Sequence, residues 1–318
     1  MRVVLLGYNG LLGSHILNQL ISHINKNYQF DLICVGRNIR NQPFNNINNI
    51  KLKYIKWDFV SFTKTKLSFL NKENIIINCV GKNSNSEKNL DKINVVFIKK
   101  LINYIQKSRI LVRLIHLGSV SVYGAEKKYL NKIINITENS QINPCDLYSK
   151  SKLESEKYIK NFSKINKKNF SYTILRISNV FSDLKNPNSF ILIHFLLKKC
   201  IWFKCSNITN YHFIHAKDIA LAVLLCICNL KKSRDKIYVV SDDINQFQLH
   251  KIYSIRYASK ILKIPISLKF LNLLVKYIPL PRIILNFILT ISSQVTYDNR
   301  KIKKELNFKT IHSLRQKF

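Results

Sequence analysis

Short apolar runs alternate with longer segments of helical periodicity along the first part of the chain. Each apolar run has the length of a buried strand, and the segments between them place apolar residues three and four positions apart, as one face of a helix requires. Strands alternating with helices predict an α/β fold with a Rossmann-type, doubly wound parallel sheet. The predicted strands are Met1–Leu6, Asp31–Val35, Leu52–Lys56, Asn74–Val80, Leu111–Leu117 and Tyr172–Ile177, and the predicted helices are Leu11–Ile24, Leu90–Gln106 and Leu147–Ile165.

Beyond about residue 180 the pattern loosens into helices and loops, with one further strand at Lys236–Val240. We therefore expect a dinucleotide-binding domain over residues 1–177 and a smaller, mainly helical substrate-binding part over residues 178–318, of which residues 215–240 return to the Rossmann sheet. The apolar stretch Ile266–Val295 is broken by lysines, prolines and an arginine, so it predicts two amphipathic or buried helices and no membrane span. These helices either cover the substrate pocket as a lid or contact a membrane surface from outside.

Three glycines, Gly7, Gly10 and Gly13, directly follow the first predicted strand and open the first helix. In that context the pattern is typical of a dinucleotide-binding loop: the first glycine permits a tight turn, the second lets a pyrophosphate approach the backbone, and the third lets the helix pack on the strand. The N–H groups at the helix N-terminus then face the phosphates. The remaining glycines are Gly36, Gly81, Gly118 and Gly124, so all seven lie in the first 124 residues. We expect them to line the path of one dinucleotide.

The end of the second strand bears on the choice between NAD and NADP. A carboxylate at that place would bind the ribose 2′-hydroxyl of NAD, but this chain has Gly36 followed by Arg37. Because a cation can hold a 2′-phosphate, the sequence slightly favours NADP(H). Asp58 follows the third strand, beside Phe59, where it can accept a hydrogen bond from the adenine amino group or cap a turn.

Tyr148 and Lys152 stand four residues apart at the start of a predicted helix, so their side chains share one helix face. An adjacent ammonium favours the phenolate of a tyrosine, which can then exchange the proton of a carbinol while a hydride moves to or from a nicotinamide. Ser119 follows the fifth strand, at the sheet edge where doubly wound folds bind ligands, and can bond the same substrate oxygen. These residues predict an oxidoreductase site.

Taken together, the motifs resemble those of the extended short-chain dehydrogenase/reductases of the NAD-dependent epimerase/dehydratase type, over nearly the whole chain. The matching positions are Gly7/Gly10/Gly13, Asp58, Gly81, Asn94, Ser119 with Val122-Tyr123-Gly124, Thr137-Glu138, Asn143-Pro144, Tyr148/Lys152, Leu175–Val180, Phe213–Ala220 and Asp298–Phe308. The resemblance implies a tightly bound NAD(P), a sugar-nucleotide substrate of the kind used in polysaccharide biosynthesis, a homodimer, and a catalytic role for Asn94 through a bound water.

The resemblance also implies a set of binding residues. Those expected at the cofactor are Gly7, Asn9, Gly10, Leu11, Leu12, Gly13, Arg37, Asp58, Phe59, Val80, Gly81, Tyr148, Lys152 and Ile177, and those expected at the substrate are Ser119, Ser121, Asn179, Asn188 and Tyr211. Tyr211 stands where epimerases of this type usually have an arginine that binds the substrate diphosphate, which keeps a lipid-linked sugar open as a rival to a nucleotide sugar.

Two further positions distinguish between reactions within this type. Its dehydratases have an Asp-Glu pair directly after the catalytic Ser or Thr, and this chain has Val120 and Ser121 there. Neither side chain can act as the acid or base that expels water. A 4,6-dehydratase is therefore disfavoured, whereas a 4-epimerase and a 4-ketosugar reductase both remain open.

Composition adds little to this picture. The 318 residues contain 52 Lys and Arg against 17 Asp and Glu, a net charge of +35, spread along the chain among Ile and Asn as a coding bias would leave it. We expect no specific nucleic-acid partner, although a non-catalytic nucleotide-binding subunit or an RNA-binding protein on this fold is the alternative from another class. The seven cysteines form no C-x-x-C pair, and His116 and His215 lack metal-ligand spacing, so we expect reduced thiols and no metal. Without a signal-peptide pattern, a cytoplasmic protein is expected.

Overall fold

The computed structural model describes residues 2–27, 31–38, 52–60, 67, 69–70, 73–82, 90–124, 133–183, 188–206 and 208–315. Its larger part is a seven-stranded sheet in which every strand runs parallel to its neighbours, in the order β3-β2-β1-β4-β5-β7-β11. These strands are β1 (Arg2–Leu6), β2 (Asp31–Gly36), β3 (Leu52–Lys56), β4 (Glu73–Asn78), β5 (Leu111–Ser119), β7 (Phe170–Ile177) and β11 (Lys236–Val240). The Rossmann-type sheet predicted from the sequence is confirmed, with all seven of the expected strands in it.

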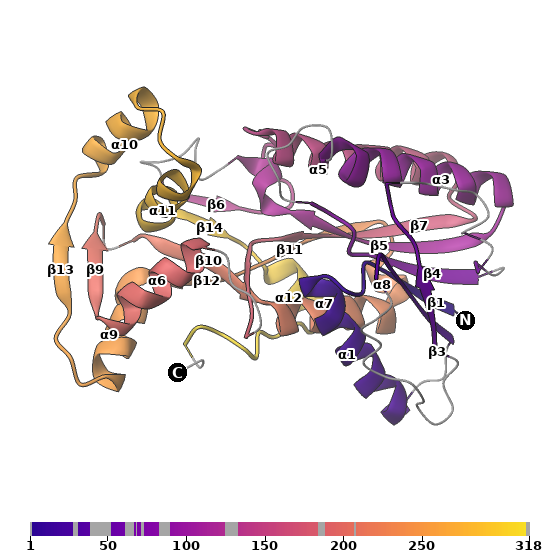
Figure 1. Cartoon of the computed structure of the whole chain (residues 1–318), viewed down its shortest axis with the longest axis horizontal. Helices are drawn as coiled ribbons and strands as arrows, with labels where there is room; N and C mark the ends of the chain where they lie inside the picture. Colours follow the sequence, from indigo (N-terminus) through magenta and orange to yellow (C-terminus); the bar gives the residue numbers. More distant parts are fainter. Residues whose placement is uncertain are drawn as a thin grey trace.

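Helices cover both faces of this sheet (Figure 1). The two faces can be followed in β1, where Val3 and Leu5 belong to the apolar core under one set of helices, and Val4 and Leu6 to the core under the other, as the strand period of two requires. The first set is α1 (Leu11–Asn27), α7 (Ala216–Cys228), α8 (Leu230–Ser233) and α12 (Arg300–Leu306); the second is a π-helical turn (Lys92–Val96), α3 (Phe97–Ser108) and α5 (Leu147–Ile165). A short 3₁₀ helix (Val120–Tyr123) follows β5.

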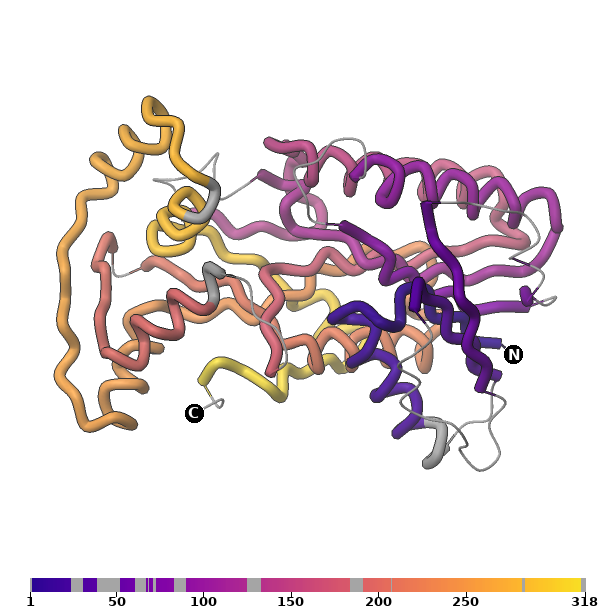
Figure 2. The backbone as a smooth tube through the Cα atoms, viewed as in Figure 1, coloured from indigo at the N-terminus to yellow at the C-terminus, as the bar shows by residue number. Residues whose placement is uncertain are grey.

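The smaller part lies at the left in Figures 1 and 2, at the other end of the molecule from β1 and β3, and it has its own apolar core. Its helices are α6 (Asn188–Lys198), α9 (Gln246–Arg256), α10 (Leu268–Tyr277) and α11 (Arg282–Ser292). Its strands are β8 (Asn179–Phe181), β9 (Ile201–Lys204), β10 (Asn210–His215), β12 (Asp242–Asn245) and β13 (Leu262–Pro265), while β14 (Val295–Tyr297) pairs with β6 (Ile134–Ile136).

The C-terminal part contains the expected helices and, in addition, strands of three small sheets that the sequence pattern did not predict. The strands concerned are three to six residues long, and their partners lie far away in the sequence: β13 pairs with β9 and β14 with β6. A run of three or four residues has no resolvable period, so these strands could not be recognised from the sequence pattern.

Candidate active site

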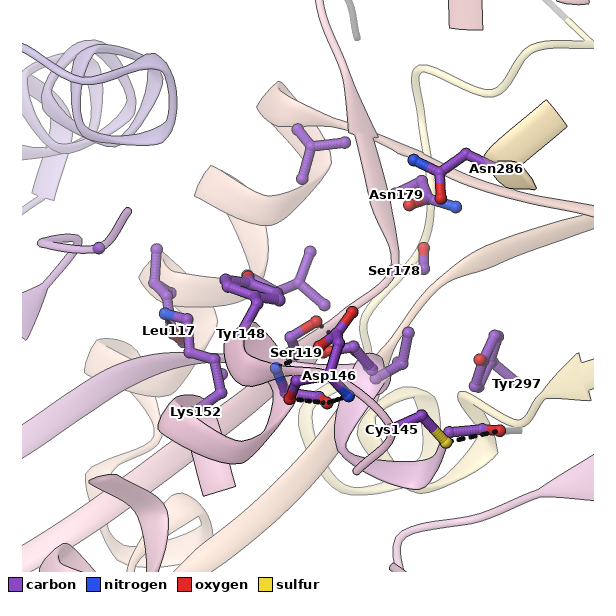
Figure 3. Close-up of a pocket in the computed structure, with 18 of the residues that line it drawn as sticks. Leu117, Ser119, Cys145, Asp146, Tyr148, Lys152, Ser178, Asn179, Asn286 and Tyr297 are labelled. Atoms are coloured by element: carbon purple, nitrogen blue, oxygen red, sulfur yellow. Dashed lines mark hydrogen bonds between the residues drawn. The ribbon is translucent and has the colours of Figure 1, made fainter. Parts of the chain in front are cut away.

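One pocket lies where the large sheet meets the smaller part, at the carboxyl ends of β4, β5 and β7 (Figure 3). This is the edge at which doubly wound sheets bind their ligands. The start of α1, the 3₁₀ turn after β5, the start of α5, and residues of α11 and β14 complete its walls. The lining residues are Leu12, Cys79, Gly81, Lys82, Leu117, Gly118, Ser119, Val120, Ser121, Gly124, Cys145, Asp146, Tyr148, Ser149, Lys152, Ile177, Ser178, Asn179, Val180, Asn286, Leu289, Thr290 and Tyr297.

The glycine loop brings α1 into close contact with β1. Gly7 has a φ of +85°, in the region that favours glycine, and its N–H donates to Val35 O at 2.8 Å. A Cβ on Gly13 would overlap the carbonyl oxygen of Gly7, so only glycine lets the helix begin this close to the strand. Gly10 N–H donates to Gly7 O at 2.9 Å and closes the turn. The loop is thus a cradle of backbone at a helix N-terminus, shaped to receive phosphate.

The end of β2 lies against this loop. Asn9 packs where a Cβ on Gly36 would be, and its Nδ2 donates to Asn38 O at 2.6 Å. Arg37, between those two backbone positions, is exposed. The structure therefore places Asn9 and Arg37 together beside the phosphate loop.

Asp58 and Phe59, also expected at the cofactor, are placed differently from one another. Asp58 is exposed, and its Oδ1 accepts from Val60 N–H at 3.3 Å, as a turn residue does. Phe59 is buried in the core against the rings of Trp57 and Phe97, with centroid distances of 5.5 and 5.2 Å. Its side chain does not line the pocket.

Tyr148 and Lys152 both line the pocket from the first turns of α5. Asp146 caps this helix: its Oδ1 accepts from Ser149 N–H at 2.8 Å, and Ser149 Oγ accepts from Asp146 N–H at 3.1 Å. One turn after Tyr148, Lys152 Nζ lies 6.0 Å from the centre of the Tyr148 ring and donates to Leu117 O at 3.0 Å. Burial lowers the pKa of Lys152 to about 8. The capped helix start thus holds a cation with a reduced pKa beside a phenol.

Ser119 and the 3₁₀ turn form the neighbouring wall. Ser119 is buried, and its Oγ accepts from Ser121 N–H at 3.2 Å. The hydroxyl oxygens of Ser121 and Ser178 are both buried at the pocket and have no hydrogen-bond partner within the described ranges. A buried hydroxyl without a partner costs free energy. These two side chains are therefore available to a bound ligand.

Asn94 lies behind the pocket rather than on its lining. Its Oδ1 accepts from Lys82 N–H at 2.9 Å, and its Nδ2 donates to Ser151 Oγ at 2.9 Å. Asn94 thereby connects the segment after β4 to Ser151 of α5, which lies between Tyr148 and Lys152 in the helix. Gly81 leaves room at the same place, since a Cβ there would lie 3.1 Å from Lys152 Nζ.

Among the other residues expected at the cofactor, Leu12 and Ile177 line the pocket. Val80 is buried and does not line the pocket, whereas the preceding residue, Cys79, does. Sequence reasoning missed Cys79 because an apolar run of this kind does not show which of its residues face a ligand. The thiol is also buried, which raises its pKa.

A buried ion pair behind Ser119 also escaped the sequence analysis. Arg176 Nη2 donates to Glu156 Oε2 at 2.7 Å, with both side chains 1% exposed, and Arg176 Nη1 donates to Tyr123 Oη at 2.7 Å. A Cβ on Gly118 would lie 2.7 Å from Glu156 Oε1, so the carboxylate fills the space beside the backbone that precedes Ser119. The available signal was Glu156 itself, one helical turn after Lys152 on the inward face of α5.

The part of the pocket remote from Lys152 differs most from expectation. Asn179, expected at the substrate, lines this part of the pocket and lies next to Asn286 of α11 in Figure 3. Tyr211, expected at the substrate, lies instead in the core of the smaller part, with its hydroxyl 3.0 Å from His250 Nε2. The expectation for Tyr211 is thus corrected: β10 turns this side chain inward. Asn188 begins α6, but its side chain is outside the described residues.

In place of Tyr211, α11 and β14 supply polar side chains to the pocket, including Asn286, Thr290 and Tyr297. The sequence analysis missed them because they reach the pocket only through the packing of the C-terminal part.

In the described ranges, no three His, Cys, Asp or Glu side chains are grouped as metal ligands would be. His116 is buried between Asn78 and Ser155, and His215 caps α7 by accepting from Lys217 N–H at 3.2 Å. None of the helices in the described part of the chain is long and apolar enough to cross a membrane.

Comparisons with solved structures find the same fold in other proteins. The structure superimposes on UDP-glucuronic acid 4-epimerase from Bacillus cereus in complex with NAD with a TM-score of 0.68, at 15% identity, over 99% of this chain and 93% of that one. UDP-glucose 4-epimerase from Thermotoga maritima with UDP-glucose gives 0.67 at 16% identity, over 99% and 96%. DesIV, a dTDP-glucose 4,6-dehydratase from Streptomyces venezuelae, gives 0.69 at 16% identity, over 98% and 93%.

At these identities the superpositions show the fold alone. None of the curated proteins compared with this chain matches its sequence. The model of one protein family, however, matches residues 3–241, which is most of the chain and includes the glycine loop, Ser119, Tyr148 and Lys152. The chain belongs to the NAD dependent epimerase/dehydratase family.

Proposed function

We propose that this protein transfers a hydride at a sugar carbon of a nucleotide-linked sugar, as a 4-epimerase or a 4-ketosugar reductase, and does not eliminate water. One observation carries the proposal. The pocket brings Ser119, Tyr148 and Lys152 together, while Asp146 is the only carboxylate among its described lining residues.

The three side chains divide the chemistry between them. Tyr148 takes or gives the proton of the substrate hydroxyl at its Oη, and Ser119 Oγ bonds to the same oxygen. Lys152, one helical turn away, favours the phenolate of Tyr148 because its ammonium lies near the ring. Burial of that ammonium strengthens the interaction, since the effective dielectric constant is lower away from water.

Among the described lining residues there is no second carboxylate beside Asp146, which argues against dehydration. Loss of water from a 4-ketosugar needs one group to take a proton from carbon and another to protonate the leaving hydroxyl. Val120 and Ser121 can do neither. Asp146 is already engaged, because its Oδ1 accepts the backbone N–H that it caps at the start of α5.

The family implies NAD(P), and the residues of this chain fit it. Leu12, between Gly10 and Gly13 at the start of α1, lines the same pocket as Lys152. When bound, the nicotinamide supplies or accepts the hydride. We propose that residues 1–177 hold this cofactor, and that Arg37 favours the 2′-phosphate of NADP(H).

The substrate would lie against the remaining wall, formed by residues 178–318. Its described polar groups are hydroxyls and amides, notably Ser178, Asn179, Asn286 and Thr290. The unpartnered hydroxyls of Ser121 and Ser178 suit sugar hydroxyls, because a ligand would supply the hydrogen bonds that they lack. UDP-glucose and UDP-glucuronic acid are bound by structures with this fold, which supports a nucleotide sugar.

Two measurements test the proposal. Mass spectrometry of the cofactor released from purified protein, followed by turnover of UDP- and dTDP-hexoses and their 4-keto derivatives, distinguishes the two reactions. Retained oxidised cofactor with interconversion of epimers identifies an epimerase, whereas NAD(P)H-dependent consumption of a 4-ketosugar identifies a reductase. A 4-keto-6-deoxy product would refute the proposal. So would the lack of any turnover together with salt-sensitive RNA binding, which would point to the non-catalytic alternative.

The Tyr148→Phe variant tests the assignment of the proton-transferring group. It should lower turnover by at least about a hundredfold and leave cofactor binding intact, because it removes one oxygen and no packing. Tyr158→Phe is the matched control, since Tyr158 lies on the same helix with its hydroxyl bonded to Asn103 Oδ1, away from the pocket. Activity similar to the wild type in Tyr148→Phe would reject the assignment.

A further inference from the structure

The outermost helix of the C-terminal part, α10, turns an apolar face toward solvent. Phe270, Leu273 and Tyr277 are three and four residues apart and so lie on one side of the helix, where they are 55%, 56% and 66% exposed. Lys269 and Lys276 are exposed too, and they directly precede Phe270 and Tyr277 in the helix. We call these five residues the α10 face.

The opposite side of α10 secures the helix to the protein. Leu271 is buried in the core of the C-terminal part, and Leu274 and Val275 pack against that core. The chain runs from β13 through α10 at the edge of the molecule and then turns inward to α11 (Figures 1 and 2). α11 lines the pocket, and α10 does not. The exposed stripe is therefore not the part of this region that covers the substrate.

The charge around the α10 face has a single sign. Residues 244–297, which include α9, β13, α10 and α11, contain seven Lys and Arg and no Asp or Glu. Two copies of such a face would repel each other, which argues against self-association through it. An amphipathic helix with aromatic and aliphatic side chains on one side and lysines at its flank instead suits an anionic lipid surface.

We propose that the α10 face docks on an anionic lipid bilayer. Phe270, Leu273 and Tyr277 enter the boundary between headgroups and acyl chains, and the Lys269 and Lys276 ammonium groups stay at the lipid phosphates. The contact is peripheral, in line with the lack of a membrane-crossing helix among the described residues. Because α11 packs on α10 and also lines the pocket, docking would hold the pocket near the membrane surface.

Vesicle co-sedimentation of the full chain tests this docking. Vesicles of phosphatidylcholine with phosphatidylglycerol should bind the protein, and vesicles of phosphatidylcholine alone should bind it much more weakly. The variant Phe270→Gln/Leu273→Gln/Tyr277→Gln keeps good helix formers at solvent-facing positions and should weaken binding by more than about tenfold. Lys269→Gln/Lys276→Gln should weaken it by about fivefold per lysine.

Matched controls lie on α5. Ile165→Gln removes an apolar side chain that is 81% exposed, and Lys157→Gln/Lys164→Gln removes two exposed lysines with the same seven-residue spacing. Both controls should bind vesicles as the wild type does. Equal losses in the controls and the α10 variants would show attraction by net charge alone and overturn the proposal.

Two further results would overturn it: no binding to anionic vesicles, or a change from dimer to monomer in the triple glutamine variant by light scattering, which would make a second copy the occupant. Docking does not depend on the proposed reaction. Turnover of soluble sugar nucleotides should be the same in all these variants, so a failure of either proposal can be recognised separately.

Discussion

Two glutamates on α5 provide a direct test of how burial changes the contribution of an ion pair to the free energy of unfolding. Glu156 pairs with Arg176 at 2.7 Å with both side chains 1% exposed, and Glu154 pairs with Lys99 at 2.6 Å with side chains 51% and 40% exposed. The two glutamates are two residues apart on one helix. The perturbation is Glu156→Gln, which keeps the shape of the side chain but removes its charge.

The expected cost follows from what remains after the substitution. In Glu156→Gln the Arg176 guanidinium stays buried, bonded to Tyr123 Oη but without a counter-charge. Breaking a buried pair in this way costs about 3–5 kcal/mol of unfolding free energy. For 318 residues the unfolding entropy is about 0.7 kcal/mol/K, so Tm should fall by about 4–7 °C. Glu154→Gln should cost less than about 1 kcal/mol, because water and salt screen an exposed pair.

Urea unfolding followed by tryptophan fluorescence measures both variants. The chain has two tryptophans, and both are buried: Trp57 reports on the core beside the large sheet, and Trp202 on the smaller part. Substituting both partners, as Glu156→Leu with Arg176→Met, should recover much of the lost stability because no charge is left buried. Similar losses in Glu156→Gln and Glu154→Gln would refute the reasoning, as would a double variant less stable than Glu156→Gln.

Three other predictions concern Lys152, Arg37 and the glycine loop. Burial lowers the pKa of Lys152 to about 8, so between pH 8 and about 10.5 the unfolded chain holds a proton that the folded chain has lost. The unfolding free energy of the wild type should therefore rise by about 3 kcal/mol across this window relative to that of Lys152→Met. Equal pH profiles for the two proteins would contradict this prediction. Arg37→Ser should weaken NADPH binding by about tenfold in calorimetric titration and leave NADH binding unchanged; an equal effect on both would remove the preference for NADP(H). Gly13→Ala should destabilise the fold by more than about 2 kcal/mol, because the new Cβ would overlap the backbone of Gly7. In Gly10→Ala the new Cβ would contact a single atom, at 3.3 Å, so this variant should lose clearly less stability in the same denaturation assay.

Much of the Rossmann-type part was predictable because its signals are local. The strand, the three glycines and the helix that follows them are consecutive, and their backbone geometry depends on residues within a few positions. The same holds for Tyr148 and Lys152, which share a helix face by their spacing alone. The predicted sheet and family are confirmed, and Tyr148 and Lys152 line one pocket together with Leu12, which follows Gly10 at the start of α1.

Tertiary structure decided which residues of the C-terminal part line the pocket, and which buried residues pack behind Ser119. The sequence analysis expected Tyr211 at the substrate and did not single out Asn286, yet β10 turns Tyr211 into a core and α11 turns Asn286 toward the pocket. The Arg176–Glu156 pair joins β7 to α5, and the small sheets pair strands many residues apart. The sequence alone determined the main strands and helices, the glycine loop and the pairing of Tyr148 with Lys152, because each depends on residues within one or two helical turns of one another. Contacts between distant segments depend on how those elements pack, and packing is a property of the whole fold.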